Sequence, residues 1–149
     1  MRYDIKLSMR KTKFFNKEER KWILIDVKDK ILGRVSTRIA RILQGKTKPT
    51  YSPNFLCGDR VIVINAKLVK FSGNKRESKI YDKFTGFPSG RKEMSLKVLI
   101  EKNTSRVLYL AVKGMLPKSN LGAKMLKSLK IYPEGTHKQQ AKKPQTIGV

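Results

Sequence analysis

The sequence predicts an α/β fold, a single-domain sandwich built on a small, mostly parallel sheet. Two short segments, 22–27 and 61–65, are rich in apolar and β-branched residues and indicate buried strands, with an amphipathic helical pattern between them. A strand that is apolar on both faces is typical of a parallel sheet covered by helices. Strand, helix and strand, followed by further helices without a repeat in 149 residues, therefore favour one α/β domain.

The first 21 residues are polar, basic and without sustained periodicity, and they lack the apolar run of a secretory signal. We therefore expect a basic N-terminal arm over residues 1–21. The next segment, Trp22 to Val27, is a short apolar run that ends at charged residues. It predicts the first buried strand and the start of the folded domain.

Residues 34–44 carry the pattern of an amphipathic helix. Gly45 suits the position just past the helix end, and Pro49 prevents the helix from continuing. The apolar residues fall on one face, and three arginines form a separate stripe at spacing i, i+4, i+7. The predicted core face is Val35, Ile39, Ile42 and Leu43, and the arginine stripe is Arg34, Arg38 and Arg41.

The segment 61–65 follows a Gly58-Asp59 turn signal and is the clearest strand of the chain. Residues 67–84 alternate loosely around the sequence Ser-Gly-Asn-Lys at 72–75, which predicts a hairpin with a basic tip. The glycine-rich stretch 84–90 predicts a loop.

The C-terminal half predicts helices with one ambiguity. Residues 95–102 indicate a helix, whereas 106–112 are apolar nearly throughout and fit either a strand or a buried helix. A last amphipathic helix is predicted around Leu121 to Leu129, with lysines on its outer face. Residues 133–149 have little apolar content. We therefore expect a folded domain over 22–132 and a basic C-terminal tail over 133–149.

The charge of the chain indicates a polyanionic partner. Lys and Arg number 35 against 11 Asp and Glu, a net charge of +24. Only residues 93–117 approach balance, so the excess belongs to the folded body and not to one tail. Repulsion among so many cations destabilises an isolated compact chain, which makes nucleic acid the natural counterpart.

Several classes of protein are disfavoured by the composition. No apolar run approaches the roughly 20 residues of a membrane span, and no basic helix shows a separate bulky apolar face for a membrane surface. The single cysteine, Cys57, allows no internal disulfide and indicates a reducing compartment. With one histidine, His137, we expect no metal site.

An enzyme is also disfavoured. The sequence Ala40-x-x-x-x-Gly45-Lys46-Thr47 matches a relaxed phosphate-loop pattern of nucleoside triphosphatases, the alternative function in a different class. That loop needs a strand before it and a helix starting at the lysine, whereas here a helix precedes Gly45. Lys46 and Lys48 are better explained as cations at a helix C-terminus. We expect no catalysis, no cofactor and no small-molecule substrate.

Clusters of cations with almost no interleaved acid are the functional signal. A solvated surface normally mixes both signs, so these clusters predict contacts with phosphates. No zinc-finger, homeodomain or basic-zipper pattern is present, and RNA recognised by shape and backbone is favoured over sequence-specific DNA. A non-specific coating of nucleic acids or anionic surfaces is the remaining alternative.

The sequence Gly114-Met115-Leu116-Pro117, followed by Gly122 and by Leu129-Lys-Ile-Tyr132, resembles the signature of the universal large-ribosomal-subunit protein thirteen family, in its bacterial or organellar form. Further motifs follow in the order of the family from about residue 22 to 144, among them Leu32-Gly33-Arg34, Gly58-Asp59-x-Val-Ile-Val-Ile-Asn65-Ala66, Thr85-Gly-Phe-Pro88 and Ala111-Val-Lys-Gly114. The resemblance implies a three-layer α/β/α sandwich around a four-stranded parallel sheet, with 106–112 helical.

The resemblance also implies a structural protein that binds large-subunit ribosomal RNA and supports subunit assembly. Its partners would be that RNA and neighbouring ribosomal proteins, reached through arm and tail, in the cytoplasmic ribosome of a bacterium or alternatively in a mitochondrial or plastid ribosome. In the turn at 114–117, glycine and proline would fix the backbone while Met115 and Leu116 pack inward. Three RNA surfaces are expected: Arg34, Arg38, Arg41, Lys46 and Lys48; then Lys75, Arg76 and Lys79; then Lys113, Lys118, Lys124, Lys127 and His137.

Overall fold

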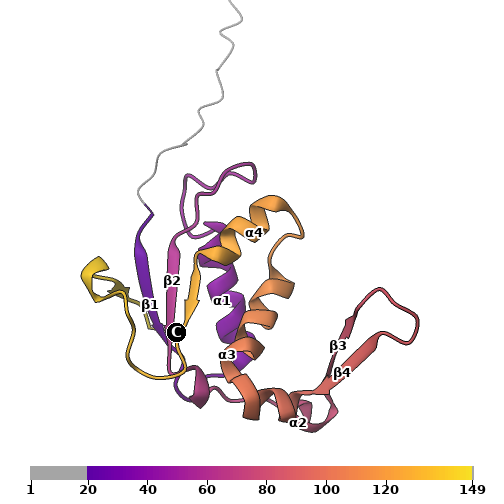
Figure 1. The fold of residues 1–149 in the computed structure, drawn as a ribbon. Coiled ribbons are helices and arrows are strands. Elements are labelled where there is room, and N and C mark those ends of the chain that lie inside the picture. The colour runs from indigo at the N-terminus through magenta and orange to yellow at the C-terminus, as the bar shows by residue number, and fades with distance from the viewer. Residues whose placement is uncertain (1–19, 149) are drawn as a thin grey trace, which may run out of the picture.

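A parallel sheet of four short strands organises the chain. The computed structural model describes residues 20–148, so nearly all of the predicted arm lies outside the described residues (Figure 1). The strand order is β5-β2-β1-β6, and every pair in this sheet is parallel. The predicted α/β class and small parallel sheet are thereby confirmed. The strands are β1 (Trp22–Asp26), β2 (Arg60–Ile64), β5 (Leu129–Ile131) and β6 (Gln145–Thr146).

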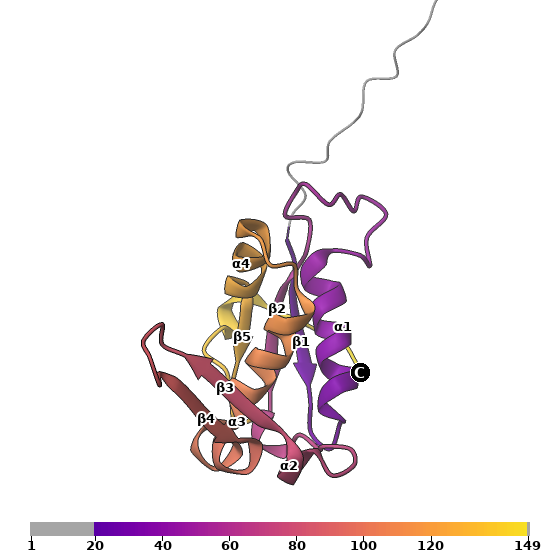
Figure 2. The same ribbon diagram turned by 90° about the vertical axis from the view of Figure 1, so that its right-hand side faces the viewer.

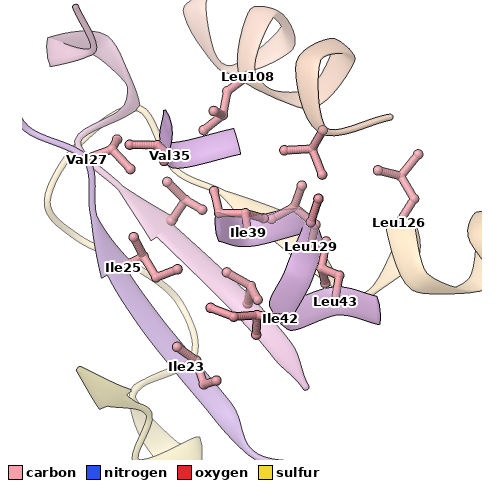
Figure 3. Close-up of a cluster of buried hydrophobic side chains, with 14 of the residues drawn as sticks. Ile23, Ile25, Val27, Val35, Ile39, Ile42, Leu43, Leu108, Leu126 and Leu129 are labelled. Carbon is pink, nitrogen blue, oxygen red and sulfur yellow. The ribbon is translucent and has the colours of Figure 1, made fainter. Parts of the chain in front are cut away.

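Three helices pack together on one face of this sheet, as Figures 1 and 2 show. The predicted core face of the first helix is confirmed: Val35, Ile39 and Leu43 are buried against Ile25 of β1 and its neighbours (Figure 3). Each fully buried side chain of this size contributes about 1.5–3 kcal/mol. The helices are α1 (Leu32–Gln44), α3 (Leu96–Met115) and α4 (Asn120–Lys127).

The helix-free face of the sheet is covered by the segment that leaves β5. This segment starts beside β2 at one edge and ends in β6 beside β1, so it must cross the face that the helices leave open. Its single 3-10 turn, η2 (Gln140–Lys142), lies on the far side of the sheet from α3 in both ribbon views. Ile62, which points to this face, is fully buried. Residues 133–149, predicted as a tail, therefore contain the fourth strand.

The ambiguous segment 106–112 is helical, as the resemblance implies. It lies in α3, which consists of two helical parts joined at Asn103, where φ is −163° and ψ is 91°. The side chain of Asn103 accepts a hydrogen bond from the backbone N–H of Arg106 at 3.2 Å and so caps the second part. The first part coincides with the helix predicted over 95–102.

The hairpin predicted around residues 72–75 is wrong. Gly73, with a φ of +63°, turns the chain into the short helix α2 (Lys75–Ser78). The hairpin is formed instead by β3 (Ile80–Phe84) and β4 (Arg91–Ser95), which pair antiparallel around the glycine-rich loop. The two N–H···O=C hydrogen bonds from Thr85 to Gly90 and from Gly90 to Phe87 close that loop.

Two glycines of the signature differ sharply in what the fold requires of them. A Cβ on Gly122 would overlap the carbonyl oxygen of Pro117, whereas a Cβ on Gly114 would meet no atom within 4 Å. The close approach at Gly122 seats the start of α4 on the turn, where Ser119 accepts a hydrogen bond from the Gly122 N–H at 3.2 Å.

This difference predicts opposite effects of the same substitution. Gly122→Ala should lower the free energy of unfolding by about 1–3 kcal/mol because the turn must move away from the new methyl group. Gly114→Ala, inside the last turn of α3, should raise it by about 0.5–1 kcal/mol because alanine is the better helix former. Thermal unfolding of the two variants measures both, and equal shifts in Tm would contradict the packing described.

Candidate nucleic-acid interface

The arginine stripe of α1 borders a groove. Because the apolar face of α1 is buried in the core, Arg34, Arg38 and Arg41 are exposed on its outer side. Together with Ile23 and Ile147 they line a hollow of about 630 Å³ beside β6. No acidic residue lines this groove, and none of the three arginines pairs with a carboxylate in the described part of the chain. The structure thus brings the three predicted arginines together.

The end of α1 does not form a phosphate loop. Gly45 adopts a left-handed conformation with φ of +82°, and its N–H donates to the carbonyl of Ile42 at 3.0 Å. A Cβ at this position would lie 2.9 Å from the backbone nitrogen of Gly58. The helix therefore ends here against the start of β2, and no helix begins at Lys46, which is exposed. The positive helix end that a phosphate loop requires is absent from this point.

Lys48 has a structural role, whereas it was expected to contact RNA together with Lys46. Its Nζ lies 2.7 Å from Oδ1 of Asp59, and the two side chains are only 18% and 7% exposed. The same carboxylate oxygen accepts a hydrogen bond from the backbone N–H of Lys21 at 2.9 Å. Asp59, predicted as part of the structural framework, thus ties the loop after α1 to the start of β1. The ammonium group of Lys48 is engaged there and is not presented beside Lys46.

The second predicted cluster is divided between two hollows. Lys75 and Lys79 line a pocket of about 320 Å³ between α1, α2 and α3, whereas Arg76 lines another, of about 360 Å³, together with Lys70. The Nζ of Lys79 lies 5.2 Å from the ring centre of Tyr81. Burial raises the pKa of the Tyr81 phenol, whose hydroxyl has no hydrogen-bond partner among residues 20–148.

The third predicted cluster does not form one surface. Lys113, Lys118, Lys124 and Lys127 are exposed on α3, the following turn and α4. His137 lies instead on the segment that crosses the helix-free face, where its Nδ1 accepts a hydrogen bond from the Gln139 N–H at 3.2 Å. His137 is separated from the lysines because the chain crosses the sheet after β5 instead of staying beside α4.

The signature turn is also only partly as predicted. Leu116 is buried, but Met115 is 41% exposed. Leu116 lies one helical turn after Val112 and takes the inward position, so Met115 is left beside α1. There its sulfur accepts a hydrogen bond from the Thr37 hydroxyl at 3.7 Å, and its carbonyl accepts one from the Gln44 side chain at 3.3 Å.

A further cationic surface lies where the parallel strands begin, and only two of its cations, Lys124 and Lys127, were predicted from the sequence. We call it the strand-start surface; it surrounds a hollow of about 380 Å³ that no acidic residue lines. The guanidinium carbon of Arg60 lies 5.0 Å from the ring centre of Trp22, its register partner on the neighbouring strand. The surface consists of Arg20, Arg60, Lys124, Lys127 and Lys130 around Trp22.

Electrostatic repulsion is already present at this surface. The pKa of Arg20 is lowered from its ordinary value, first by burial and then by the charge of Arg60. The side chain of Arg20 is fixed by a 2.8 Å hydrogen bond to the carbonyl of Gly58. A usable signal existed in the sequence, because parallel strands all start at one edge of a sheet, and cations stand at or near the starts of β1, β2 and β5.

Metal and membrane sites receive no support within residues 20–148. No group of three His, Cys, Asp or Glu side chains there is arranged to hold a metal ion, and Cys57 is buried. None of the helices in this range has the length and apolar character to cross a membrane.

Comparison with known proteins identifies close relatives over most of the chain. The family model for ribosomal protein L13 matches residues 20–138. Large ribosomal subunit protein uL13 of Thermoanaerobacter sp. (strain X514) is 49% identical over 131 residues, which cover 88% of this chain and 92% of that protein. The protein of the same name from Dictyoglomus thermophilum is 48% identical over 141 residues, which cover 93% and 99%. That from Petrotoga mobilis is 48% identical over 131 residues, covering 88% and 87%.

The two lysines after α1 provide a test of the roles described above. Lys48→Met leaves the carboxylate of Asp59 without its cation in a buried setting and should lower the free energy of unfolding by up to about 3 kcal/mol. Lys46→Met removes only an exposed charge and should change it by less than about 0.5 kcal/mol. Urea unfolding at neutral pH measures both, and an unchanged midpoint for Lys48→Met would show that the ion pair does not stabilise the loop.

Proposed function

The chain belongs to the ribosomal protein L13 family of the large ribosomal subunit, and we propose that it binds large-subunit ribosomal RNA through phosphate contacts and supports assembly of the subunit. Members of the family are structural ribosomal proteins, so we propose no catalytic activity, cofactor or small-molecule substrate. The relatives named above are bacterial, which favours the cytoplasmic ribosome of a bacterium as the location.

The observation that carries the proposal is the presence of separate cationic surfaces that no carboxylate lines. The α1 groove and the strand-start surface are formed by helices and strands of the core, so the backbone positions of their cations are set before any ligand arrives. Such fixed cations displace the counterions that surround RNA, and binding gains from their release. Phosphate contacts position a protein without reading sequence.

Several surfaces on different sides of one small domain support a role in assembly. The α1 groove lies beside β6 at one edge of the sheet, while the strand-start surface includes α4 and β5 at the other. A protein that holds phosphates on two sides can fix the arrangement of two RNA segments. We propose neighbouring ribosomal proteins as further partners, through the arm and the C-terminal segment.

Sedimentation of a cell lysate tests the proposed function directly. The native protein should co-sediment with large subunits at moderate salt and leave them only at high salt, because its contacts are largely ionic. Absence from the large-subunit fraction at moderate salt would refute the proposal. Equal retention on any polyanion would favour a non-specific coating of nucleic acids instead.

The salt dependence of RNA binding tests individual cations. Arg38→Gln and Arg60→Gln should each reduce the slope of log affinity against log salt by about 0.7–0.9, one phosphate contact. Lys67→Gln should change it little, because Lys67 pairs with Glu134 at 3.0 Å. Trp22 is the only tryptophan, so its fluorescence reports on the strand-start surface. Addition of RNA should change the Trp22 emission of the Arg38→Gln variant, but should change that of Arg60→Gln much less. Equal salt slopes for all three variants would contradict the assignment of Arg38 and Arg60 to phosphate contacts.

A further inference from the structure

The β3-β4 hairpin projects from the body of the domain, as Figures 1 and 2 show. It is a separate two-stranded sheet, and only its base is anchored, where Tyr81 and Met94 pack against a small second core cluster that includes the buried Leu96. Two strands without further support are only marginally stable in water. The exposed part of the hairpin therefore has the properties of a segment that a partner covers.

One side of the hairpin, which we call the apolar face, combines exposed apolar side chains with paired charges. Residues directly opposite each other across the strands share a face, which places Ile80, Asp82 and Phe84 on the same side as Arg91 and Glu93. Ile80 is 57% and Phe84 67% exposed, and Phe87 in the adjoining loop is 73% exposed.

The single cation of the apolar face is paired with two carboxylates, so the face has one negative charge in excess. The Nε of Arg91 lies 3.0 Å from Oε1 of Glu93 and 3.6 Å from Oδ2 of Asp82. The only cation of this face is thus taken up by two carboxylates. An RNA phosphate approaching the face would meet apolar surface and a net negative charge.

The opposite side, which we call the lysine face, has the reverse character. Lys83 and Lys92 are register partners and therefore lie directly across from each other. Like charges in this position repel, and no carboxylate is on the same face to compensate them. An anion bound there would relieve the repulsion. Lys79 at the base of the hairpin adds a further positive charge on this side.

We propose that the hairpin is held between two partners in the large subunit, with its lysine face on ribosomal RNA and its apolar face against a basic segment of a neighbouring ribosomal protein. The inference rests on the proposed function. The apolar residues Ile80, Phe84 and Phe87 would be removed from water by the protein partner. The excess carboxylate of Asp82 and Glu93 would pair with cations of that partner, which is why a basic segment is specified.

Photocrosslinking in assembled large subunits tests the proposal. The full chain is made with p-benzoylphenylalanine in place of Phe84 or, as the matched control one residue away on the opposite face, in place of Lys83. After incorporation and irradiation, the Phe84 position should yield an adduct that survives ribonuclease, and peptide sequencing should place it in a Lys- and Arg-rich segment of a ribosomal protein. The Lys83 position should yield an adduct that ribonuclease degrades.

A second variant tests the charge requirement without changing size. Asp82→Asn together with Glu93→Gln should lower the yield of the protein adduct at Phe84 several-fold and leave the RNA adduct at Lys83 unchanged. An adduct of Phe84 with RNA or with an acidic protein segment, or no adduct in subunits that contain the chain, would overturn the inference and leave the proposed function standing. Failure of the unmodified chain to enter large subunits would instead remove the proposed function and the inference with it.

Discussion

The burial of the apolar stripe of α1 against β1 and β2 determines where the cations of this protein point. Ile39 and Leu43 can meet the sheet in only one rotation of the helix, and that rotation turns Arg38 and its neighbours outward. The same contact brings the end of α1 so close to the start of β2 that glycine is needed on both sides, at Gly45 and Gly58. The geometry of the basic groove is thus a consequence of core packing, and the arginines need no contacts of their own to be placed.

Parallel pairing adds a second constraint with an electrostatic cost. All four strands start at the same edge of the sheet, so cations near their starts converge whether or not they are neighbours in the chain. In the isolated protein this convergence opposes folding, because like charges brought close together repel each other. A polyanion that binds only the folded chain turns the same charges into a source of stability. The same converging cations therefore repel one another in the free protein and stabilise its complex with RNA.

The sequence predicted the elements whose signal is local. Helix α1 with its terminal Gly45, and the strands β1 and β2, follow from periodicity and turn chemistry, and the arginine stripe is visible because its spacing is that of a helix. The hairpin was misplaced because the first three residues of β4 are charged and exposed, which leaves too little alternation to detect. The Lys48 pair with Asp59 and the position of His137 depend on segments distant in the chain. Local patterns contain no information about such contacts.

The connection between β5 and β6 has a consequence for how the chain folds. One edge of β1 is completed only by β6, a strand of two residues from the far end of the domain, and β1 and α1 are both synthesised well before it. Until that late segment arrives, the backbone donors and acceptors along this edge remain open, the situation in which strands of different chains join. Contacts between segments so far apart also slow folding. During synthesis the protein can therefore associate with other chains through this open edge. The duration of that period depends on how late in the chain β6 occurs.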